Sequence, residues 1–318
     1  MANKTLKIGV VMDPIASITP KKDSTFAMLL EATRRNANIH YFEQSNLRII
    51  DGRAMGRSRV LSVVESNDAW WSFGDSIDMP LGDLDVILMR KDPPFDMEYV
   101  YTTYILDRAR LAGALVINHP QSLRDINEKA YTAWFPECTP LTLITRSMSD
   151  MRSFLAEHKK IVVKPLDGMG GKSIFVVQKG DNNANVIFET LTNHGTRFAM
   201  AQLFIPEISL GDKRILLIDG EAVPYALARI PSADDNRGNL VMGATGKGQE
   251  LSPRDRDICE RVGPVLRDRG VVFAGIDVIG DYLTEVNVTS PTGMRELDRQ
   301  FELNIAGLMF DAIEKRLN

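Results

Sequence analysis

The stretch of sequence that says most about the fold is Ile276-Asp-Val-Ile-Gly-Asp-Tyr-Leu-Thr-Glu-Val-Asn-Val288. Two β-rich runs flank the turn signal Gly280-Asp281, and this pattern predicts a hairpin. Glu285 and Asn287 point to one face of their strand because side chains alternate along it. Asp277 shares that face if three residues, 280–282, form the loop, whereas a two-residue loop turns it to the opposite face. We take the three-residue loop as the expectation.

This hairpin predicts a metal site. Asp277, Glu285 and Asn287 would converge among apolar neighbours, where like charges are costly unless a cation lies between them. Hard oxygen ligands of this kind suit Mg²⁺, particularly when nucleotide phosphates complete its shell. The alternative is an ordinary solvent-facing strand. Because Val286 and Val288 alternate with the polar pair, we favour one dry face and one ligand face.

Composition limits the class of protein. A chain of 318 residues with 44% apolar and 25% charged residues is expected to form two or three globular domains. A net charge of −4 and a pI near 5.7 argue against a nucleic-acid partner. Cys138 and Cys259 lie far apart with no CxxC motif, which predicts free thiols in a reducing compartment. The apolar run 8–12 ends at Asp13-Pro14, so it reads as a strand and not a signal peptide. No run is long enough for a membrane span, and we expect a cytoplasmic protein.

Strands and helices alternate along the chain. The N-terminal part predicts strands at 6–12, 84–89 and 114–117 and helices at 26–32, preceded by Ser24, and 99–110, a pattern typical of a parallel sheet in an α/β layer. After residue 121 we expect helices at 125–134, 185–192 and 252–267, strands at 161–164, 174–177, 198–203 and 214–218, a long loop at 232–249, the hairpin, and a final helix ending at 317. This division predicts three domains, 1–122, 123–200 and 201–318.

The glycine-rich turn Asp167-Gly-Met-Gly-Gly-Lys-Ser173 resembles two phosphate motifs and matches neither. A P-loop needs glycine where Leu166 stands, and a dinucleotide fingerprint needs a following helix where a strand is expected. What remains is a β-turn-β loop whose N–H groups could close over phosphate, or a simple structural hairpin. Lys164 lies in an apolar strand just before it, where an unpaired ammonium is costly. A bound polyphosphate is the preferred partner, and a salt bridge to a core carboxylate is the alternative.

Several segments together resemble the ATP-grasp carboxylate–amine ligases and, within them, the bacterial glutathione synthetase family. They are Val11-Met-Asp-Pro-Ile15, Leu88-Met-Arg-Lys-Asp-Pro-Pro-Phe95, Lys164-Pro-Leu-Asp-Gly-Met-Gly-Gly171, Ala201-Gln-Leu-Phe-Ile205, Gly211-Asp-Lys-Arg214, Ala228-Arg-Ile-Pro231, Arg237-Gly-Asn-Leu240 and Thr284-Glu-Val-Asn-Val-Thr-Ser-Pro-Thr292. The resemblance implies an ATP-grasp fold preceded by an N-terminal Rossmann-like domain. It also implies ATP-dependent ligation of γ-glutamylcysteine and glycine through an acyl phosphate, two Mg²⁺ ions (with Mn²⁺ as a substitute), and a homotetramer.

The resemblance also implies roles for individual residues. Lys129, Lys164, Gly168, Gly170 and Gly171 would hold the ATP phosphates; Gln202, Leu203 and Ile205 would line the adenine slot; Asp212 would meet the ribose; Asn239 would lie in a loop over the nucleotide. Asp277, Glu285 and Asn287 would hold the metal ions, Arg214 and Arg229 would neutralise the transferring phosphoryl group, and Asp13, Arg90, Ser290, Thr292 and Gly293 would meet the dipeptide. Gly293 departs from members that carry cysteine there.

Two other functions stay open at this stage. One is a different ATP-grasp ligase, making D-alanyl-D-alanine or adding amino acids to a protein tail. The other is a regulatory protein that binds nucleotide without chemistry. The segment Arg90-Lys-Asp-Pro-Pro94 favours glutathione synthesis because it lies outside the shared ATP-binding part. Arg214 could also be a solvated strand end, and Asp13 could cap a turn. Trp70, Trp71, Tyr99, Tyr101 and Tyr104 are expected in the core or at a subunit interface.

Overall fold

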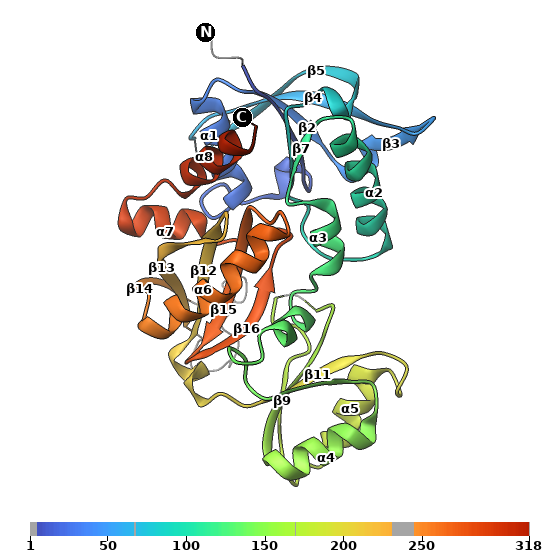
Figure 1. Ribbon diagram of the computed structural model, residues 1–318, viewed down its shortest axis with the longest axis vertical. Helices are drawn as coiled ribbons and strands as arrows, with labels where there is room; N and C mark the ends of the chain where they lie inside the picture. The colour runs from blue at the N-terminus through green and yellow to red at the C-terminus, as the bar shows by residue number, and fades with distance from the viewer. Residues whose placement is uncertain (1–4, 67, 169, 231–244, 318) are drawn as a thin grey trace.

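Three β-sheets follow one another along the long axis of the molecule (Figure 1). The structure is a computed structural model that describes residues 5–66, 68–168, 170–230 and 245–317. The N-terminal sheet lies at one end, the C-terminal sheet in the middle and the central sheet at the other end. The sequence order of the last two sheets is therefore reversed in space.

The N-terminal sheet has the order β3-β4-β2-β1-β6-β7, with β5 paired to the outer side of β4. Its strands are β1 (Lys7–Val11), β2 (Asn38–Phe42), β3 (Leu47–Ile50), β4 (Arg53–Val63), β5 (Trp71–Pro80), β6 (Val86–Met89) and β7 (Leu115–Ile117). Pairing is parallel from β2 through β1 and β6 to β7, as the alternating pattern predicts. Helices α1 (Ser24–Arg34) and α2 (Met97–Leu111) connect strands of this sheet, and α3 (Pro120–Asp125) follows β7. Short 3₁₀ turns are η1 (Ile15–Ser17), η2 (Gln44–Asn46) and η3 (Leu81–Asp83). The antiparallel addition β3-β4-β5 was not predicted.

The central sheet is antiparallel, in the order β10-β9-β11-β8. Its elements are β8 (Thr142–Thr145), α4 (Met148–His158), β9 (Lys160–Pro165), β10 (Phe175–Gln178), α5 (Ala184–Thr192) and β11 (Ala199–Leu203). The two helices cover one face of this sheet and close a separate small core that includes Met151, Val163 and Phe188. Strand β11 runs across the boundary expected between residues 200 and 201, and it pairs only with strands of this sheet.

The C-terminal sheet is antiparallel, in the order β14-β13-β12-β15-β16. Its elements are η4 (Ala130–Trp134) and η5 (Pro206–Leu210) on the approach, then β12 (Asp212–Ile218), β13 (Glu221–Ile230), β14 (Thr245–Glu250), α6 (Pro253–Asp268), β15 (Phe273–Ile279), β16 (Tyr282–Asn287), α7 (Met294–Phe301) and α8 (Ile305–Leu317). Ser252 caps the N-terminus of α6: its hydroxyl accepts from Asp255 N–H, while the Asp255 carboxylate accepts from Ser252 N–H.

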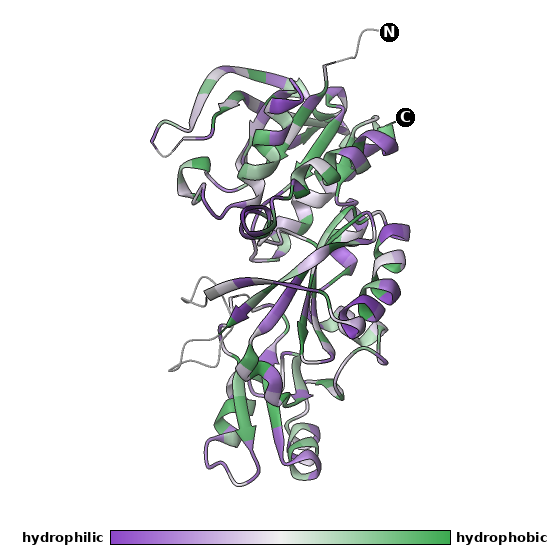
Figure 2. Ribbon diagram, turned by 90° about the vertical axis from the view of Figure 1, so that its left-hand side faces the viewer, coloured by the Kyte–Doolittle hydropathy of each residue, from purple (hydrophilic) through white to green (hydrophobic). Residues whose placement is uncertain are grey.

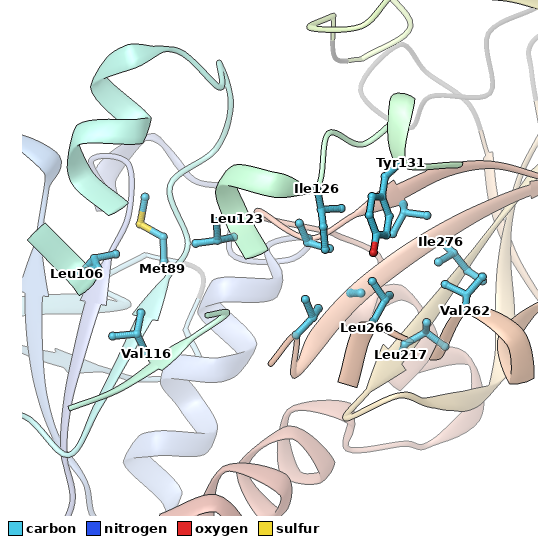
Figure 3. Close-up of a cluster of buried hydrophobic side chains, with 14 of the residues drawn as sticks. Met89, Leu106, Val116, Leu123, Ile126, Tyr131, Leu217, Val262, Leu266 and Ile276 are labelled. Carbon is cyan, nitrogen blue, oxygen red and sulfur yellow. The ribbon is translucent and has the colours of Figure 1, made fainter. Parts of the chain in front are cut away.

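One hydrophobic core joins the N-terminal and C-terminal sheets. Figure 3 shows it running from Met89 and Leu106 through Leu123 to Leu217 and Ile276. Asn118 fastens the same junction, because its side-chain amide donates to Phe273 O and Val288 O and accepts from the N–H groups of Val272 and Phe273, at 2.7–3.0 Å. The central sheet, with its own core, is therefore the part of the molecule least tied to the rest.

Side-chain alternation gives the C-terminal sheet two different faces. Ile215, Leu217 and Ile276 pack with α6 in the core shared with the N-terminal sheet. On the other face Leu216 and Ile218 pack in a second apolar cluster with α8, and the remaining end of that face is polar. Figure 2 shows the result as hydrophilic segments within otherwise apolar strands of this sheet. This polar face is where the predicted ligands meet.

Three local expectations are wrong. The helix expected at 125–134 does not form, because α3 ends at Asp125 and Asn127 Oδ1 then accepts from the N–H groups of Lys129 and Ala130, which starts the separate turn η4. Residues 245–249 were expected in a loop but belong to β14, paired with β13.

The length of the hairpin loop is the third wrong expectation. It has two residues, because Ile279 pairs with Tyr282. A bulge on β16 then leaves Thr284 unpaired, so that Asp277 still faces Glu285. The expected pairing is confirmed, although a bulge and not a longer loop produces it.

Candidate active site

Strand register gathers the charged side chains of the polar face. Arg214 on β12 pairs with Asp277 on β15, and Asp277 pairs with Glu285 on β16. One step along, Arg229 on β13 pairs with Asp212 on β12. Residues two apart on a strand share a face, so a single polar surface results. Val286 and Val288 are buried on the opposite face, which confirms the expected dry side.

Arg214 and Arg229 both hold Asp277. Arg214 Nε donates to Asp277 Oδ1 at 2.5 Å and its Nη2 to Oδ2 at 2.9 Å, while Arg229 Nη2 lies 2.8 Å from Oδ2. All three residues are buried. Burial opposes the charge on Asp277, but the two guanidinium groups outweigh it and hold its pKa well below the ordinary value. The carboxylate therefore stays ionised.

Gly275 makes room for this arrangement. It precedes Asp277 by two residues, and a Cβ atom there would lie 2.8 Å from Arg214 Cδ and 2.9 Å from Pro291 Cβ. A side chain at this position would displace the arginine stem. Nothing in the local sequence marks this glycine as necessary.

Asp212 is the second partner of Arg229. Arg229 Nε donates to Asp212 Oδ1 at 2.8 Å, and Nη2 bonds Oδ2. Burial raises the pKa of Asp212 to about 6, against the attraction of Arg229. Asp212 was expected to contact the ribose, but both of its carboxylate oxygens bind Arg229.

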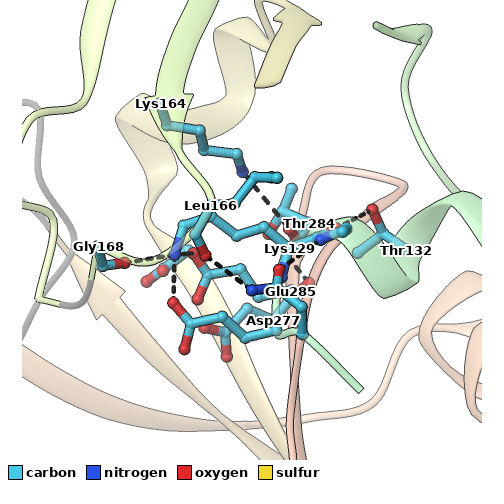
Figure 4. Close-up of polar contacts among 12 residues, drawn as sticks. Lys129, Thr132, Lys164, Leu166, Gly168, Asp277, Thr284 and Glu285 are labelled. Carbon is cyan, nitrogen blue, oxygen red and sulfur yellow. Dashed lines mark hydrogen bonds and ion pairs between the residues drawn. The ribbon is translucent and has the colours of Figure 1, made fainter. Parts of the chain in front are cut away.

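Lys129 is held between two glutamates. Its Nζ contacts Glu128 Oε1, lies 3.5 Å from Glu285 Oε1, and donates to Gly168 O (Figure 4). Burial opposes the ammonium charge, but Glu285 and Glu128 outweigh it and raise the pKa of Lys129. Burial, reinforced by Glu285, raises the pKa of Glu128 to about 7. The sequence reading missed Glu128, although it directly precedes Lys129.

Lys164 on β9 reaches the same point from the central sheet (Figure 4). It is only 5% exposed, and its Nζ donates to Thr284 O at 3.5 Å. Among the described residues no carboxylate lies within 4.0 Å of this ammonium group. Burial lowers the pKa of Lys164 to about 8, despite the attraction of Glu285. The alternative of a salt bridge to a core carboxylate is therefore wrong.

The expected nucleotide residues border this point on the central sheet. Gly168 lies in the turn three residues after β9, the strand that carries Lys164. Gly170 and Gly171 have positive φ angles of 71° and 75°, which favour glycine. Gln202 is buried on β11, where its Nε2 donates to Thr142 Oγ1 at 2.9 Å. Leu203 is partly exposed and its N–H donates to Leu141 O, while Ile205 is buried. Asn239 lies outside the described residues.

The expected substrate residues meet at the junction of the N-terminal and C-terminal sheets. Arg90 follows β6 and is buried; its Nε donates to Thr25 Oγ1 at 3.0 Å and its Nη2 to Pro291 O at 3.2 Å. Ser290 Oγ donates to Arg90 O at 3.3 Å. No described carboxylate lies within ion-pair distance of Arg90, and burial lowers its pKa.

The remaining substrate candidates flank this group. Asp13 accepts from Asp92 N–H at 2.9 Å and pairs with Lys91 at 2.9 Å. Gly293 begins α7 with φ of 107°, and a Cβ there would lie 3.6 Å from Arg214 Cγ. Thr292, which is exposed, stands directly before it. The loop 290–293 thus links the Arg90 group to Arg214 and Arg229, the arginine pair.

The oxygen donors on the polar face suit a divalent cation. Asp277 and Glu285 are cross-strand neighbours, and Asn287 shares the face of Glu285. Both oxygens of Asp277 are held by Arg214 and Arg229, so a cation there would compete with the two guanidinium groups. The amide nitrogen of Asn287 is buried without a hydrogen-bond partner; it is a donor that suits a phosphate oxygen, while only the amide oxygen could coordinate a cation. No group of three or more His, Cys, Asp or Glu side chains within the described part of the chain is arranged to hold a metal by itself. The donor set therefore fits an ion that also takes oxygens from a phosphate ligand.

Two family models together cover nearly the whole chain. Residues 6–124 match "Prokaryotic glutathione synthetase, N-terminal domain", and residues 128–302 match "Prokaryotic glutathione synthetase, ATP-grasp domain". The chain belongs to the prokaryotic glutathione synthetase family. Glutathione synthetase of Escherichia coli strain K12 is 54% identical over 312 residues, which cover 98% of this chain and 99% of the relative. Glutathione synthetase of Salmonella typhimurium strain LT2 is 55% identical with the same coverage.

Solved structures of other ligases share the fold. The D-cycloserine synthetase DcsG superposes with a TM-score of 0.68 at 16% identity, covering 98% of this chain and 100% of that chain. The ATP-grasp ligase PsnB with a minimal precursor gives 0.64 at 18%, with 98% and 99% coverage.

These findings confirm the expected ATP-grasp fold and its N-terminal domain. The chain is an ATP-dependent carboxylate–amine ligase of the glutathione-forming type. The regulatory and other-ligase alternatives are not favoured. Within the described residues, no helix is long and apolar enough to cross a membrane.

Proposed function

We propose that this polar face carries out the glutathione synthetase reaction with the residues expected from the sequence. The observation that supports the assignment best is Lys164, a buried ammonium group with only a distant carbonyl contact at 3.5 Å. Such a group is stabilised by an anion, and we infer that this anion is the polyphosphate of ATP.

The nucleotide is proposed to lie between the central and C-terminal sheets. Lys129, Lys164, Gly168, Gly170 and Gly171 would hold its phosphates, and Gln202, Leu203, Ile205 and Asn239 would line or cover the base. Asp212 is better suited to orient Arg229 than to accept from ribose, because Arg229 already takes both of its oxygens.

Asp277, Glu285 and Asn287 are the proposed holders of two Mg²⁺ ions, with Mn²⁺ as a substitute. When bound, such ions would neutralise phosphate charge during phosphoryl transfer. Lys129 would then exchange part of its contact with Glu285 for phosphate, since Glu285 would be shared with the metal.

The chemistry proceeds in two steps. The cysteinyl carboxylate of γ-glutamylcysteine attacks the γ-phosphorus and ADP leaves; the glycine amine then attacks the acyl carbon, loses a proton, and inorganic phosphate leaves. We assign charge neutralisation on the transferring group to Arg214 and Arg229, whose forked donors fit phosphoryl oxygens. Arg90, Asp13 and the loop carrying Ser290, Thr292 and Gly293 are proposed to bind the dipeptide, with Arg90 as the carboxylate partner.

Two further properties are proposed from family membership alone. They are a homotetrameric assembly and a cytoplasmic location. The net charge of −4 is compatible with small-molecule partners and gives no reason to expect nucleic acid.

Phosphate release tests the function directly. The chain is incubated with ATP and Mg²⁺, with γ-glutamylcysteine and glycine supplied together and each omitted in turn. Release that requires both substrates, with glutathione formed in equal amount, is the expected result. If phosphate were released only with other amino acids or peptides, the substrate assignment would be wrong but the ligase chemistry would stand.

A further inference from the structure

Glu296 on α7 carries a carboxylate oxygen that is sealed from solvent. Its Oε2 is buried without a hydrogen-bond partner, and the carboxylate accepts from the backbone N–H of Glu296 itself. Among the described residues, no Lys, Arg or His nitrogen lies within 4.0 Å of this carboxylate. Burial raises the pKa of Glu296, because nearby cations do not fully offset the loss of water. A sealed acceptor of this kind is stabilised by a donor from a bound molecule.

The position of Glu296 on α7 turns it toward the C-terminal sheet. Helix α7 lies between α1 and the strands β13 and β14 (Figure 1). Gln300 stands one helical turn after Glu296 on the same face, and its Oε1 accepts from Gly248 N–H on β14 at 2.7 Å. At the start of α7, a Cβ atom on Gly293 would lie 3.6 Å from Arg214 Cγ. Glu296 therefore faces the sheet on the side that carries Arg214, directly after the loop proposed to bind the dipeptide.

Lys22 supplies a cation near this carboxylate. It is exposed in the turn just before α1, and its charge attracts Glu296. The start of α1 contacts α7, because Met294 N–H donates to Ser24 Oγ at 3.4 Å. No carboxylate in the described part of the chain lies within ion-pair distance of Lys22. Lys22 and Glu296 are thus neighbouring opposite charges that do not form an ion pair with each other.

The other cations near Glu296 are engaged elsewhere. Arg295 and Arg299 both attract Glu296, but they lie on a different side of α7. Arg295 pairs with Glu65 at 2.6 Å, and Arg299 Nε donates to Arg295 O at 3.2 Å. Lys22 is therefore the cation best placed to share a ligand with Glu296.

An α-amino acid head group matches these two residues. It carries an ammonium and a carboxylate on one carbon atom, so a site for it needs an anion and a cation close together. The γ-glutamyl end of γ-glutamylcysteine presents such a head, far from the cysteinyl carboxylate that reacts. The N-terminus of an ordinary peptide offers the ammonium without the carboxylate, and the pair would therefore discriminate against it.

We propose that Glu296 and Lys22 recognise the α-amino acid head of the γ-glutamyl group, with Glu296 accepting from its ammonium and Lys22 donating to its carboxylate. This inference rests on the proposed function and adds two residues that select the substrate. Arg90 is then available for the other carboxylate of the dipeptide. Because neither Glu296 nor Lys22 touches the reacting atoms, their loss should raise KM for the dipeptide and leave kcat largely unchanged.

A dipeptide without the ammonium tests Glu296. N-Glutarylcysteine keeps both carboxylates of γ-glutamylcysteine and lacks its amino group. Steady-state phosphate release at saturating ATP and glycine gives KM and kcat for each dipeptide, and an inhibition constant replaces KM if the analogue is not turned over. Glu296→Gln should raise KM for γ-glutamylcysteine about tenfold or more, as expected for a hydrogen bond between charged groups. It should leave the value for N-glutarylcysteine within about twofold, because that ligand has no ammonium to lose.

A dipeptide without the carboxylate tests Lys22. γ-Aminobutyrylcysteine keeps the ammonium and lacks the α-carboxylate. Lys22→Met should raise KM for γ-glutamylcysteine about threefold or more, a smaller effect because Lys22 is exposed. The same substitution should leave KM for γ-aminobutyrylcysteine within about twofold. The two variants thus give a crossed pattern that a general disturbance of the fold would not produce.

Two variants serve as matched controls. Glu65→Gln removes the carboxylate that contacts Arg295 from another side of α7, and Glu65 is 66% exposed. Lys21→Met removes the exposed lysine next to Lys22. Both should leave every KM within about twofold of wild type. Circular dichroism and urea unfolding establish that each variant is folded, and Glu296→Asp, which withdraws the carboxylate by one methylene, replaces Glu296→Gln if the latter is not.

Three results would overturn the inference. They are an unchanged KM for γ-glutamylcysteine in Glu296→Gln, an equal rise for N-glutarylcysteine, and an equal rise in Glu65→Gln. An equal rise for both dipeptides in Lys22→Met would overturn the role of Lys22. A wild-type chain that releases no phosphate with γ-glutamylcysteine and glycine would overturn the proposed function itself, and this outcome is distinct because it is seen before any substitution is made.

Discussion

Gly275→Ala offers the sharpest test of the arginine pair. The added methyl would lie 2.8 Å from Arg214 Cδ, 2.9 Å from Pro291 Cβ and 3.2 Å from Arg214 Nε. These distances are shorter than normal contacts, and Pro291 is part of the chain turn beside Arg90, so the arginine must move. Arg214 and Arg229 together donate three contacts to Asp277, and two of the three come from Arg214.

The cost can be worked out from this geometry. Overpacking of a close-packed site costs about 1–3 kcal/mol in unfolding free energy, and Arg229 remains to pair with Asp277. The larger effect should fall on turnover, because loss of one positioned donor to a developing charge costs roughly 10²–10³-fold. We therefore expect kcat to fall by about that factor while the fold is retained.

The assay is steady-state phosphate release at saturating substrates, beside urea unfolding. Gly74→Ala on β5 is the matched control, because the nearest atom to its Cβ would be Val60 Cβ at 3.5 Å, followed by two further Val60 atoms at 3.9 Å, all ordinary contacts. Gly275→Ala with kcat within about twofold of wild type would refute the reasoning, since loss of a working donor should cost far more. So would an equal loss in Gly74→Ala.

Four other outcomes follow from the same contacts. Lys164→Met should weaken ATP binding yet stabilise the ligand-free protein by about 1–3 kcal/mol, because it removes a buried unpaired charge; urea unfolding and ATP titration measure the two effects, and a destabilised variant would contradict this account. Because the pKa of Lys164 is about 8 when folded and 10.5 ordinarily, the unfolded chain binds more protons between those values, so wild-type stability should gain up to roughly 3 kcal/mol relative to Lys164→Met as pH rises from 8 to 10.5. Asp212→Asn should lower kcat with little change in KM for ATP if the carboxylate orients Arg229, whereas a rise confined to KM would restore the ribose role. Glu285→Gln should abolish turnover with the circular dichroism spectrum unchanged, and near-normal activity would remove its metal assignment.

Local sequence determined a large part of this protein. The hairpin 276–288, the glycine turn after β9 and the buried lysine before it are all signalled by residue type and alternation, and they led to the correct fold family. The parallel strands β1, β6 and β7 were visible for the same reason, since they are short apolar runs between helices. The resemblance of several motifs in one order then indicated the chemistry.

Tertiary structure decided what lies between these segments. Strands β3, β4 and β5 form consecutive hairpins, but only the pairing of β4 with β2 joins them to the parallel strands. Glu128 became a partner of Lys129 only through the turn η4, and Gly275 became necessary only because Arg214 crosses above it.

Asp277 shows the division most clearly. Its residue type marked it as a ligand, but its face depended on a bulge at Thr284 that no local signal indicated. Its two arginine partners come from β12 and β13, which lie beside it only in the folded sheet. A residue's own chemistry can be read from sequence, whereas the charges that surround it are set by long-range strand pairing.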